Sequence, residues 1–115
     1  MASSPLAFRF VFEVAVRAGE EERFIQHWKN CSKHIQEYPG ARGTRLHKKH
    51  GVGSTYVAIA EWDSKESRVA AMDDIRKGES ERAKRIQACG NNEDYGDVTV
   101  LADLDEIARV LPFGS

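Results

Sequence analysis

The chain has 115 residues, of which 41% are apolar, and 17 basic and 18 acidic side chains give it a formal net charge of −1. A chain of this length forms one domain and buries roughly two-thirds of its unfolded surface. The balanced charge provides no positive field for nucleic acid or for an anionic membrane. We therefore expect a single domain over residues 1–115, with its core in residues 8–104 and neither nucleic acid nor a membrane as partner.

The amino terminus and the cysteines bear on the compartment. Residues 1–8 lack the basic start and the apolar stretch of a secretory signal. Arg9 and Glu13 interrupt the longest apolar run, which falls short of the roughly twenty residues of a membrane-spanning helix. Cys31 and Cys89 are expected as free thiols. These features favour a soluble, cytoplasmic protein.

The first two elements are predicted from the spacing of apolar residues. Residues 8–16 alternate as in a strand, and one side is wholly apolar, with Phe8, Phe10, Phe12, Val14 and Val16. The acidic run 20–22 then favours a helix N-terminus. One helical stripe follows, formed by Phe24, Trp28, Cys31, Ile35 and Tyr38.

Pro39 and Gly40 predict the end of this helix, because proline cannot continue the hydrogen-bond ladder and glycine adopts the turn that follows. Strands at about 42–50 and 55–62, joined by a glycine-rich loop, predict a hairpin. Asp63 is the expected N-cap of a second helix, and Glu66 is its capping-box partner.

The apolar face of this second helix is expected to carry Val69, Met72 and Ile75. Gly78 predicts a break, and a further helical piece containing Ala83 and Ile86 should follow it. The last strand is expected at about 95–104. The tail 105–111 is predicted to form one amphipathic turn through Ile107 and Leu111.

The order strand, helix, strand, strand, helix, strand predicts an α+β protein of the ferredoxin-like type. In that arrangement the helices cover one face of a four-stranded antiparallel sheet. The opposite face would mix aliphatic and charged side chains, namely Val11, Ala15, Val57, Ile59 and Leu101 with Arg9, Glu13, Glu61 and Thr99. Such a face favours a homodimer in which two sheets pack together with their charges paired.

The chain also resembles a known family. Phe24 with Trp28, the stop at Pro39-Gly40, and the segment Ala60-Glu61-Trp62-Asp63-Ser64 are similar to the antibiotic biosynthesis monooxygenase family over about residues 8–104. The resemblance implies a dimeric α+β barrel with a pocket in each subunit between helices and sheet. It also implies one of two activities: cofactor-free oxygenation of polycyclic phenols or quinols, or monooxygenation that degrades haem.

When the sequence is matched to the family residue by residue, Trp62 corresponds to the family's tryptophan. The histidine that holds the haem iron has no counterpart in residues 64–88, and the asparagines Asn30, Asn91 and Asn92 lie outside the predicted strands. A haem-degrading enzyme therefore ranks third. A cofactor-independent monooxygenase of a quinol or polyphenol ranks first, with no cofactor. A non-catalytic small-molecule-binding or stress-related dimer is the alternative. For the oxygenase, another polar group must replace the missing strand asparagine.

Five residues are candidates for the site. His27 and His34 lie seven residues apart at the margin of the apolar stripe, and either is a possible general base. Their separation of about 10 Å along the axis is too long for one metal ion, so no metal site is expected. Trp62 is a candidate pocket wall, and Tyr56 and Tyr38 are candidate hydrogen-bond donors to a small aromatic ligand. A purely structural role remains open for each of them.

Overall fold

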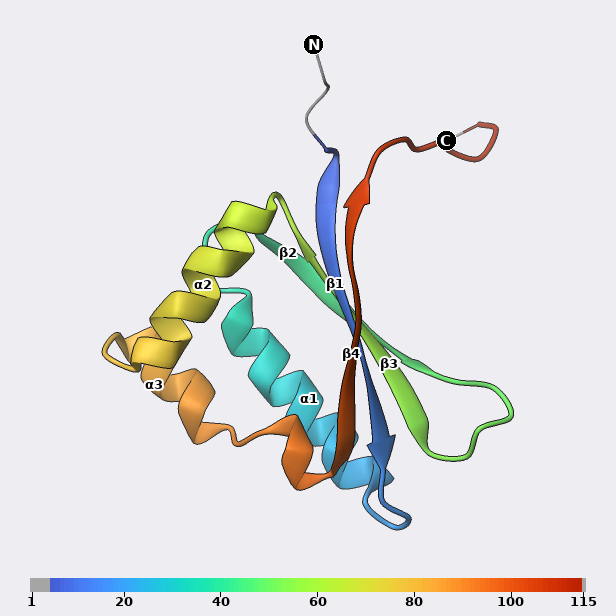
Figure 1. The fold of residues 1–115 in the computed structure, drawn as a ribbon, viewed down its shortest axis with the longest axis vertical. Helices are drawn as coiled ribbons and strands as arrows, with labels where there is room; N and C mark the ends of the chain where they lie inside the picture. Colours follow the sequence, from blue (N-terminus) through green and yellow to red (C-terminus); the bar gives the residue numbers. More distant parts are fainter. Residues whose placement is uncertain (1–4, 115) are drawn as a thin grey trace.

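The computed structural model describes residues 5–114 as a four-stranded antiparallel sheet with helices packed on one face (Figure 1). The strand order is β2-β3-β1-β4, which confirms the predicted ferredoxin-like α+β fold. The elements in chain order are β1 (Ala7–Val16), α1 (Glu21–Ile35), β2 (Ala41–Lys48), β3 (Thr55–Trp62), α2 (Lys65–Lys77), α3 (Glu81–Ala88), the 3₁₀ helix η1 (Asn92–Asp94) and β4 (Gly96–Glu106).

The core lies between the helices and the sheet, in two clusters at opposite ends. One cluster joins Phe8 of β1 to Trp62 of β3, with Tyr38 and Ala71. The other is built from Val14, Val16, Phe24 and Tyr56. The predicted phenylalanine side of β1 thus packs against the helices. Between the two clusters, the middle of the sheet is covered less tightly.

Two helix boundaries differ from the sequence-based expectation. α1 ends at Ile35, so Tyr38 lies in the turn beyond the helix rather than on it. The N-cap of α2 is Ser64, not Asp63, because the Ser64 hydroxyl accepts the backbone N–H of Ser67 at 3.1 Å. The Asp63 backbone N–H instead donates to the Gly40 carbonyl at 2.8 Å, tying the start of α2 to the turn before β2.

The predicted break at Gly78 is confirmed. Gly78 closes α2 in the left-handed conformation, with φ of 68°, and Ser80 caps the N-terminus of α3. On α2, however, Val69 points outward and is 45% exposed, while Ala71 joins the core.

The second half of β4 also departs from the expected pattern. The register against β1 shifts between Val11 and Phe12, so Ala102 rather than Leu101 faces Val11. The strand runs on to Glu106, and the predicted amphipathic turn at 105–111 is wrong. The segment after Glu106 is irregular and leads away from the sheet (Figure 1), and its apolar side chains Ile107, Val110, Leu111 and Phe113 are exposed.

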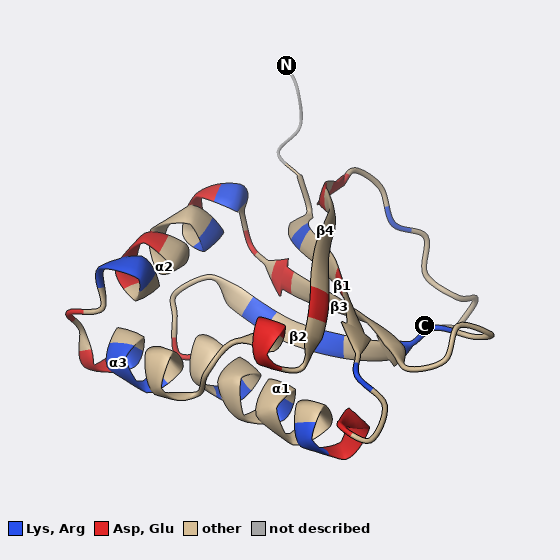
Figure 2. Ribbon diagram, turned by 60° about the horizontal axis from the view of Figure 1, so that its bottom comes forward, with Lys and Arg blue, Asp and Glu red and all other residues tan. Residues whose placement is uncertain are grey.

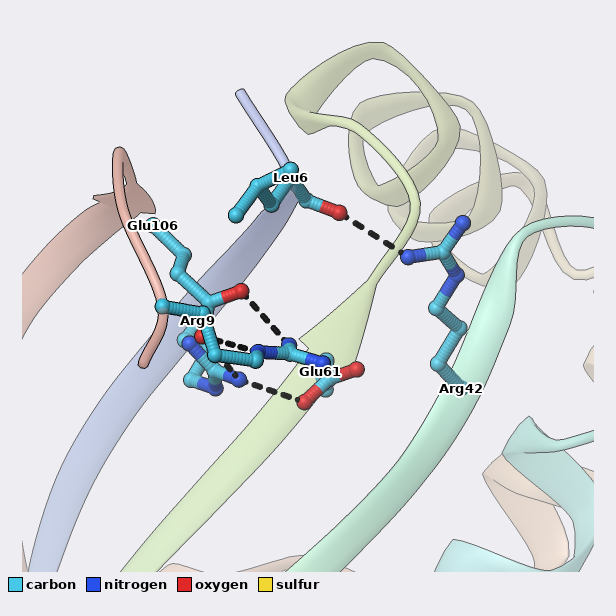
Figure 3. A network of polar contacts seen from close by, with 6 residues as sticks. Leu6, Arg9, Arg42, Glu61 and Glu106 are labelled. Carbon is cyan, nitrogen blue, oxygen red and sulfur yellow. Dashed lines mark hydrogen bonds and ion pairs between the residues drawn. The ribbon is translucent and has the colours of Figure 1, made fainter. Parts of the chain in front are cut away.

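The helix-free face of the sheet holds a network centred on Arg9 (Figure 3). The Arg9 guanidinium lies 2.8 Å from Glu61 and 3.2 Å from Glu106, and Lys49 pairs with Glu13 at 3.1 Å. Basic and acidic residues both occur on the helical layer and on the sheet in the view of Figure 2, and on α1 the acidic ones lie at its N-terminal end. Within residues 5–114, no helix is long and apolar enough to cross a membrane.

Candidate functional site

A cavity of about 220 Å³ separates the helical layer from the middle of the sheet. Most of its wall is apolar or aromatic, and the polar side chains on it come from four different elements. The lining residues are Phe10, Phe12, Trp28, Cys31, Ser32, Ile35, Thr44, Ala58, Ile59, Ala60, Trp62, Arg68, Met72 and Asn92.

Small residues in β3 create this space. Ala58 and Ala60 point to the helical side, opposite Phe12 and Phe10 of β1. Their methyl groups do not reach the stripe of α1 above them, so the volume that larger side chains would fill stays open. The cavity is therefore a property of the strand sequence, and side chains of α1, α2 and η1 complete its walls.

Trp62 closes one end of the cavity. It is 1% exposed and packs with Phe8 and Tyr38 in the core cluster at that end. The ring thus contributes both to the core and to the cavity wall.

Asn92 and His27 form a polar pair at the other side. Asn92 lies in η1, lines the cavity, and has its Oδ1 atom 3.2 Å from His27 Nε2. His27 is 8% exposed, is not on the cavity wall, and has Nδ1 3.0 Å from the Cys89 carbonyl oxygen. Because that carbonyl can only accept, Nδ1 carries a hydrogen and donates it. Sequence reasoning missed Asn92, since η1 carries no periodic pattern.

Cys31 also lines the cavity and lies beside His27. Its Sγ lies 3.7 Å from His27 Nδ1. Burial, together with a contact to the Cys89 thiol, raises the pKa of Cys31 to about 12. The thiol is therefore protonated at neutral pH and acts as a small apolar part of the wall.

Arg68 is the one charged side chain on the cavity wall among the described residues. It belongs to the first turn of α2, and its guanidinium carbon lies 3.7 Å from the centre of the Phe10 ring. Burial lowers the pKa of Arg68, and the nearby Asp103 carboxylate acts in the opposite direction. Sequence reasoning did not single out this residue.

The other sequence-derived candidates lie away from the cavity. His34 is at the surface, with Nδ1 3.4 Å from Glu37 Oε2. The Tyr38 hydroxyl donates to Asp74 at 2.8 Å, beside a surface groove between α2 and α3. Tyr56 packs on Phe24, with ring centres 5.6 Å apart. The structure therefore places Trp62 on the cavity wall. His27 is not on the wall but contacts Asn92, which is.

A metal-binding site needs several ligand side chains close together. No group of three or more His, Cys, Asp or Glu side chains in residues 5–114 is arranged to hold a metal ion. Of the other hollows, one between α2 and α3 is a surface groove rimmed by Glu81, Arg82 and Arg85. Another, of about 190 Å³, is lined largely by the charged side chains of Arg9, Arg42, Arg45 and Glu61. The cavity under α1 differs from these two in its mostly apolar and aromatic wall, which makes it the candidate site for an aromatic molecule.

The sequence profile of the antibiotic biosynthesis monooxygenase family matches residues 7–74. The chain belongs to this family. The matched segment spans β1 to most of α2 and includes every lining residue of the cavity except Asn92. Among curated proteins, no sequence matches the chain.

Solved structures share the fold of this family member. A protein of Nitrosomonas europaea assigned to the antibiotic biosynthesis monooxygenases superposes with a TM-score of 0.68 at 8% identity, covering 93% of this chain and 96% of that one. SnoaB of Streptomyces nogalater, a cofactor-independent oxygenase, gives 0.66 at 13% identity, with 95% and 98% covered. A conserved protein of Methanosarcina mazei gives 0.66 at 14% identity, with 88% and 93% covered. At these identities the likeness concerns the fold.

Proposed function

We propose that the protein is a cofactor-independent monooxygenase that oxidises a small quinol-type aromatic molecule in the cavity under α1. The observation that carries this proposal is the cavity itself, which is lined by four aromatic rings and by few polar groups. Membership of the monooxygenase family and the fold shared with SnoaB support it.

In this reaction the substrate supplies the electrons. Loss of a proton from a quinol hydroxyl gives an electron-rich anion, which passes one electron to dioxygen. The two radicals then join through a new C–O bond. Breakage of the O–O bond, with loss of the ring hydrogen, leaves a hydroxyquinone and water. One quinol and one dioxygen thus give one hydroxyquinone and one water, and the protein needs only to bind, orient and exclude bulk solvent.

The size of the cavity sets a limit on the substrate. An apolar protein cavity of about 150 Å³ holds benzene, and this one measures about 220 Å³. We therefore expect a substrate of one or two fused rings. A larger polycycle would need the helical layer to move outward.

Within this proposal, Trp62 packs against the flat face of the substrate, and Asn92 hydrogen-bonds to a substrate oxygen. His27 orients Asn92 through its Nε2 contact. His27 is kept from the cavity by Cys31 and Asn92, so it acts on the substrate through Asn92 rather than as a base in direct contact.

Oxygen uptake with a panel of hydroquinones and naphthohydroquinones tests the proposal, and oxygen-18 labelling should place one atom of dioxygen in the product. A variant that fills the cavity, Ala60→Phe, should abolish uptake, whereas Ala70→Phe on the exposed side of α2 should not. A Trp62→Phe variant should lower turnover. No enzyme-dependent uptake with any quinol of the panel would refute the oxygenase.

One observation favours the alternative of a non-catalytic binding protein. No histidine and no carboxylate is among the described residues that line the cavity, so no conventional base touches a ligand there. A binding protein would retain quinols with unchanged affinity under anaerobic conditions and would release them unaltered in air. Chromatography of the bound compound after exposure to air separates the two functions.

We also propose that the protein is a homodimer joined through the helix-free faces of two sheets. This face carries Val11, Val57, Ile59 and Leu104, and Leu104 is 48% exposed. Its central charges are already paired within the chain, because Arg9 lies between Glu61 and Glu106 (Figure 3) and Arg109 also pairs with Glu106 at 2.5 Å. Burying the Arg9 cluster would therefore leave no unpaired charge within that cluster.

Sedimentation of the wild-type protein should give a dimer at micromolar concentration. The variant Leu104→Arg should dissociate it, and Val69→Arg is the matched control, because Val69 is 45% exposed on the helical side. A wild-type monomer, or dissociation by both variants alike, would contradict this interface.

A further inference from the structure

The charge on the cavity wall, that of Arg68, has no anionic partner within residues 5–114. Of the arginines in the described part, only Arg9 and Arg68 are partly buried, and the others are exposed. Arg9 is held by the carboxylates of Glu61 and Glu106. Arg68 makes neither an ion pair nor a side-chain hydrogen bond to another residue of the 5–114 range.

The position of the Arg68 guanidinium is nevertheless fixed. It stacks on Phe10 with 3.7 Å between the guanidinium carbon and the ring centre. Stacking of this kind uses the flat face of the guanidinium and leaves its N–H groups, which lie in its own plane, free to donate. The five donors of a rigid fork are thus presented at the edge of an apolar cavity.

Partial burial makes this arrangement costly for the protein alone. A cation among apolar groups loses hydration, and here desolvation outweighs the attraction of Asp103. Asp103 is exposed, faces Phe10 in the β1–β4 register, and lies too far from Arg68 to form an ion pair. A negatively charged ligand oxygen would accept hydrogen bonds from the guanidinium and balance its charge, in place of the lost hydration.

We propose that Arg68 is an anion subsite of the cavity, where it binds the ionised oxygen of an aromatic ligand, either a phenolate or a ring carboxylate. The inference rests on the proposed function, since it assumes an aromatic molecule in the cavity. It deepens that function by naming the substrate class: a one- or two-ring aromatic that binds as its anion. The charged oxygen lies at Arg68, and the rings lie between Trp28 and Trp62.

Para-nitrophenol tests the subsite without turnover, because its phenolate has its own absorption band and its electron-poor ring resists oxidation. Bound to the wild-type protein, it should ionise at lower pH than in free solution, and the anion should bind about 10- to 100-fold more tightly than the neutral phenol. Arg68→Met keeps the packing of the stem on Phe10 and should abolish this preference while neutral phenol still binds. Arg68→Lys should restore part of it.

Arg76→Met is the matched control, because Arg76 lies on the same helix, is exposed and pairs with Asp73 at 2.6 Å. A second pair of probes, naphthoate and its neutral alcohol naphthalenemethanol, distinguishes the two sources. Preference for naphthoate alone indicates a carboxylate ligand, and preference for nitrophenolate alone indicates a phenolate.

Equal preference in wild type and Arg68→Met would overturn the subsite, and so would failure of the wild-type protein to bind either anion at millimolar concentration. The oxygenase is judged separately by oxygen uptake. Anion-selective binding without uptake from any quinol would leave the subsite standing and remove the oxygenase. Oxygen uptake from a quinol without any preference for anions would leave the oxygenase standing and remove the subsite.

Discussion

His27 Nε2 lies 3.2 Å from Asn92 Oδ1, so the charge of the imidazole ring determines which end of the Asn92 amide faces the cavity. With Nδ1–H donating to the Cys89 carbonyl, a charged ring donates Nε2–H to Oδ1 and turns the amide NH₂ toward the cavity. A neutral ring accepts from the NH₂ and turns Oδ1 inward. One hydrogen bond thus decides whether the cavity presents a donor or an acceptor.

Replacing Asn92 should impair turnover more than binding. Asn92→Ala removes the amide that would stabilise charge developing on a substrate oxygen, and loss of one such donor typically lowers kcat about 100-fold. Asn30→Ala is the control, because Asn30 is exposed and its amide contacts only the Cys89 thiol among the described side chains. Steady-state oxygen uptake measures both, and equal rates for Asn92→Ala and wild type would remove Asn92 from the site.

Acid stability should depend on Asp74. Its Oδ2 accepts hydrogen bonds from Ser80 at 2.5 Å and from Tyr38 at 2.8 Å, and these lower the pKa of Asp74 below its ordinary value. A depressed pKa in the folded state gives stability that is present above the unfolded pKa, about 4, and is lost as the pH falls through the folded pKa.

Asp74→Asn should therefore flatten the decline in urea midpoint on acidification below about pH 5. Asp73→Asn, one residue away in an exposed pair with Arg76, should leave the decline as it is. The prediction fails when both variants keep the wild-type pH profile of the midpoint.

Gly40 and Gly19 offer a matched pair for backbone strain and steric space. Their φ angles are 86° and 87°, but a Cβ at Gly40 would lie 2.5 Å from Asp63 and Ser67 atoms, whereas nothing lies within 4 Å at Gly19. Gly19→Ala should lower the free energy of unfolding by about 1 kcal/mol, because alanine must adopt the left-handed conformation there. Gly40→Ala should cost about 1–3 kcal/mol more, because the start of α2 must shift. Chemical denaturation gives both values, and similar losses would contradict the close approach.

Cys31 should resist alkylation in the folded protein. With a pKa of about 12, roughly one thiol in ten thousand is ionised at pH 8. Iodoacetamide labelling followed by peptide mass spectrometry should show Cys31 reacting at least about 100-fold more slowly than in guanidinium-unfolded protein. Rapid labelling of the folded chain would show an ionised thiol on the cavity wall.

Periodicity was sufficient to predict the fold. The alternation in residues 8–16 and the stripe from Phe24 to Ile35 each require a partner surface, and the two surfaces meet in the structure. Local chemistry was less decisive at the boundaries. Asp63 and Ser64 are both good capping residues, and only the bond from Asp63 N–H to Gly40 leaves Ser64 to cap α2.

The site was predicted in part. Trp62 could be expected at the cavity because strand parity puts it on the helical side. Asn92 could not, since its contact with His27 joins residues 65 positions apart through a loop. Arg68 resembled any charge on an amphipathic helix, and its stacking on Phe10 depends on how closely α2 approaches β1. Contacts of this kind depend on tertiary distance, which no residue pattern encodes.

Leu101 is the unpaired residue at the register shift in β4, and this bulge determines on which side of the sheet the acidic side chains that follow it lie. Because the register shifts beside Val11, Asp103 stands opposite Phe10 and Leu104 opposite Arg9. If Leu101 instead paired with Val11, without the bulge, plain alternation would turn the remainder of the strand over and send Leu104 toward Arg68 and Asp103 toward Glu61. Deleting Leu101, by contrast, would remove the bulge and leave Ala102 opposite Val11 and Asp103 opposite Phe10, so the unpaired residue is what keeps the acidic side chain of Asp103 on the side of Arg68.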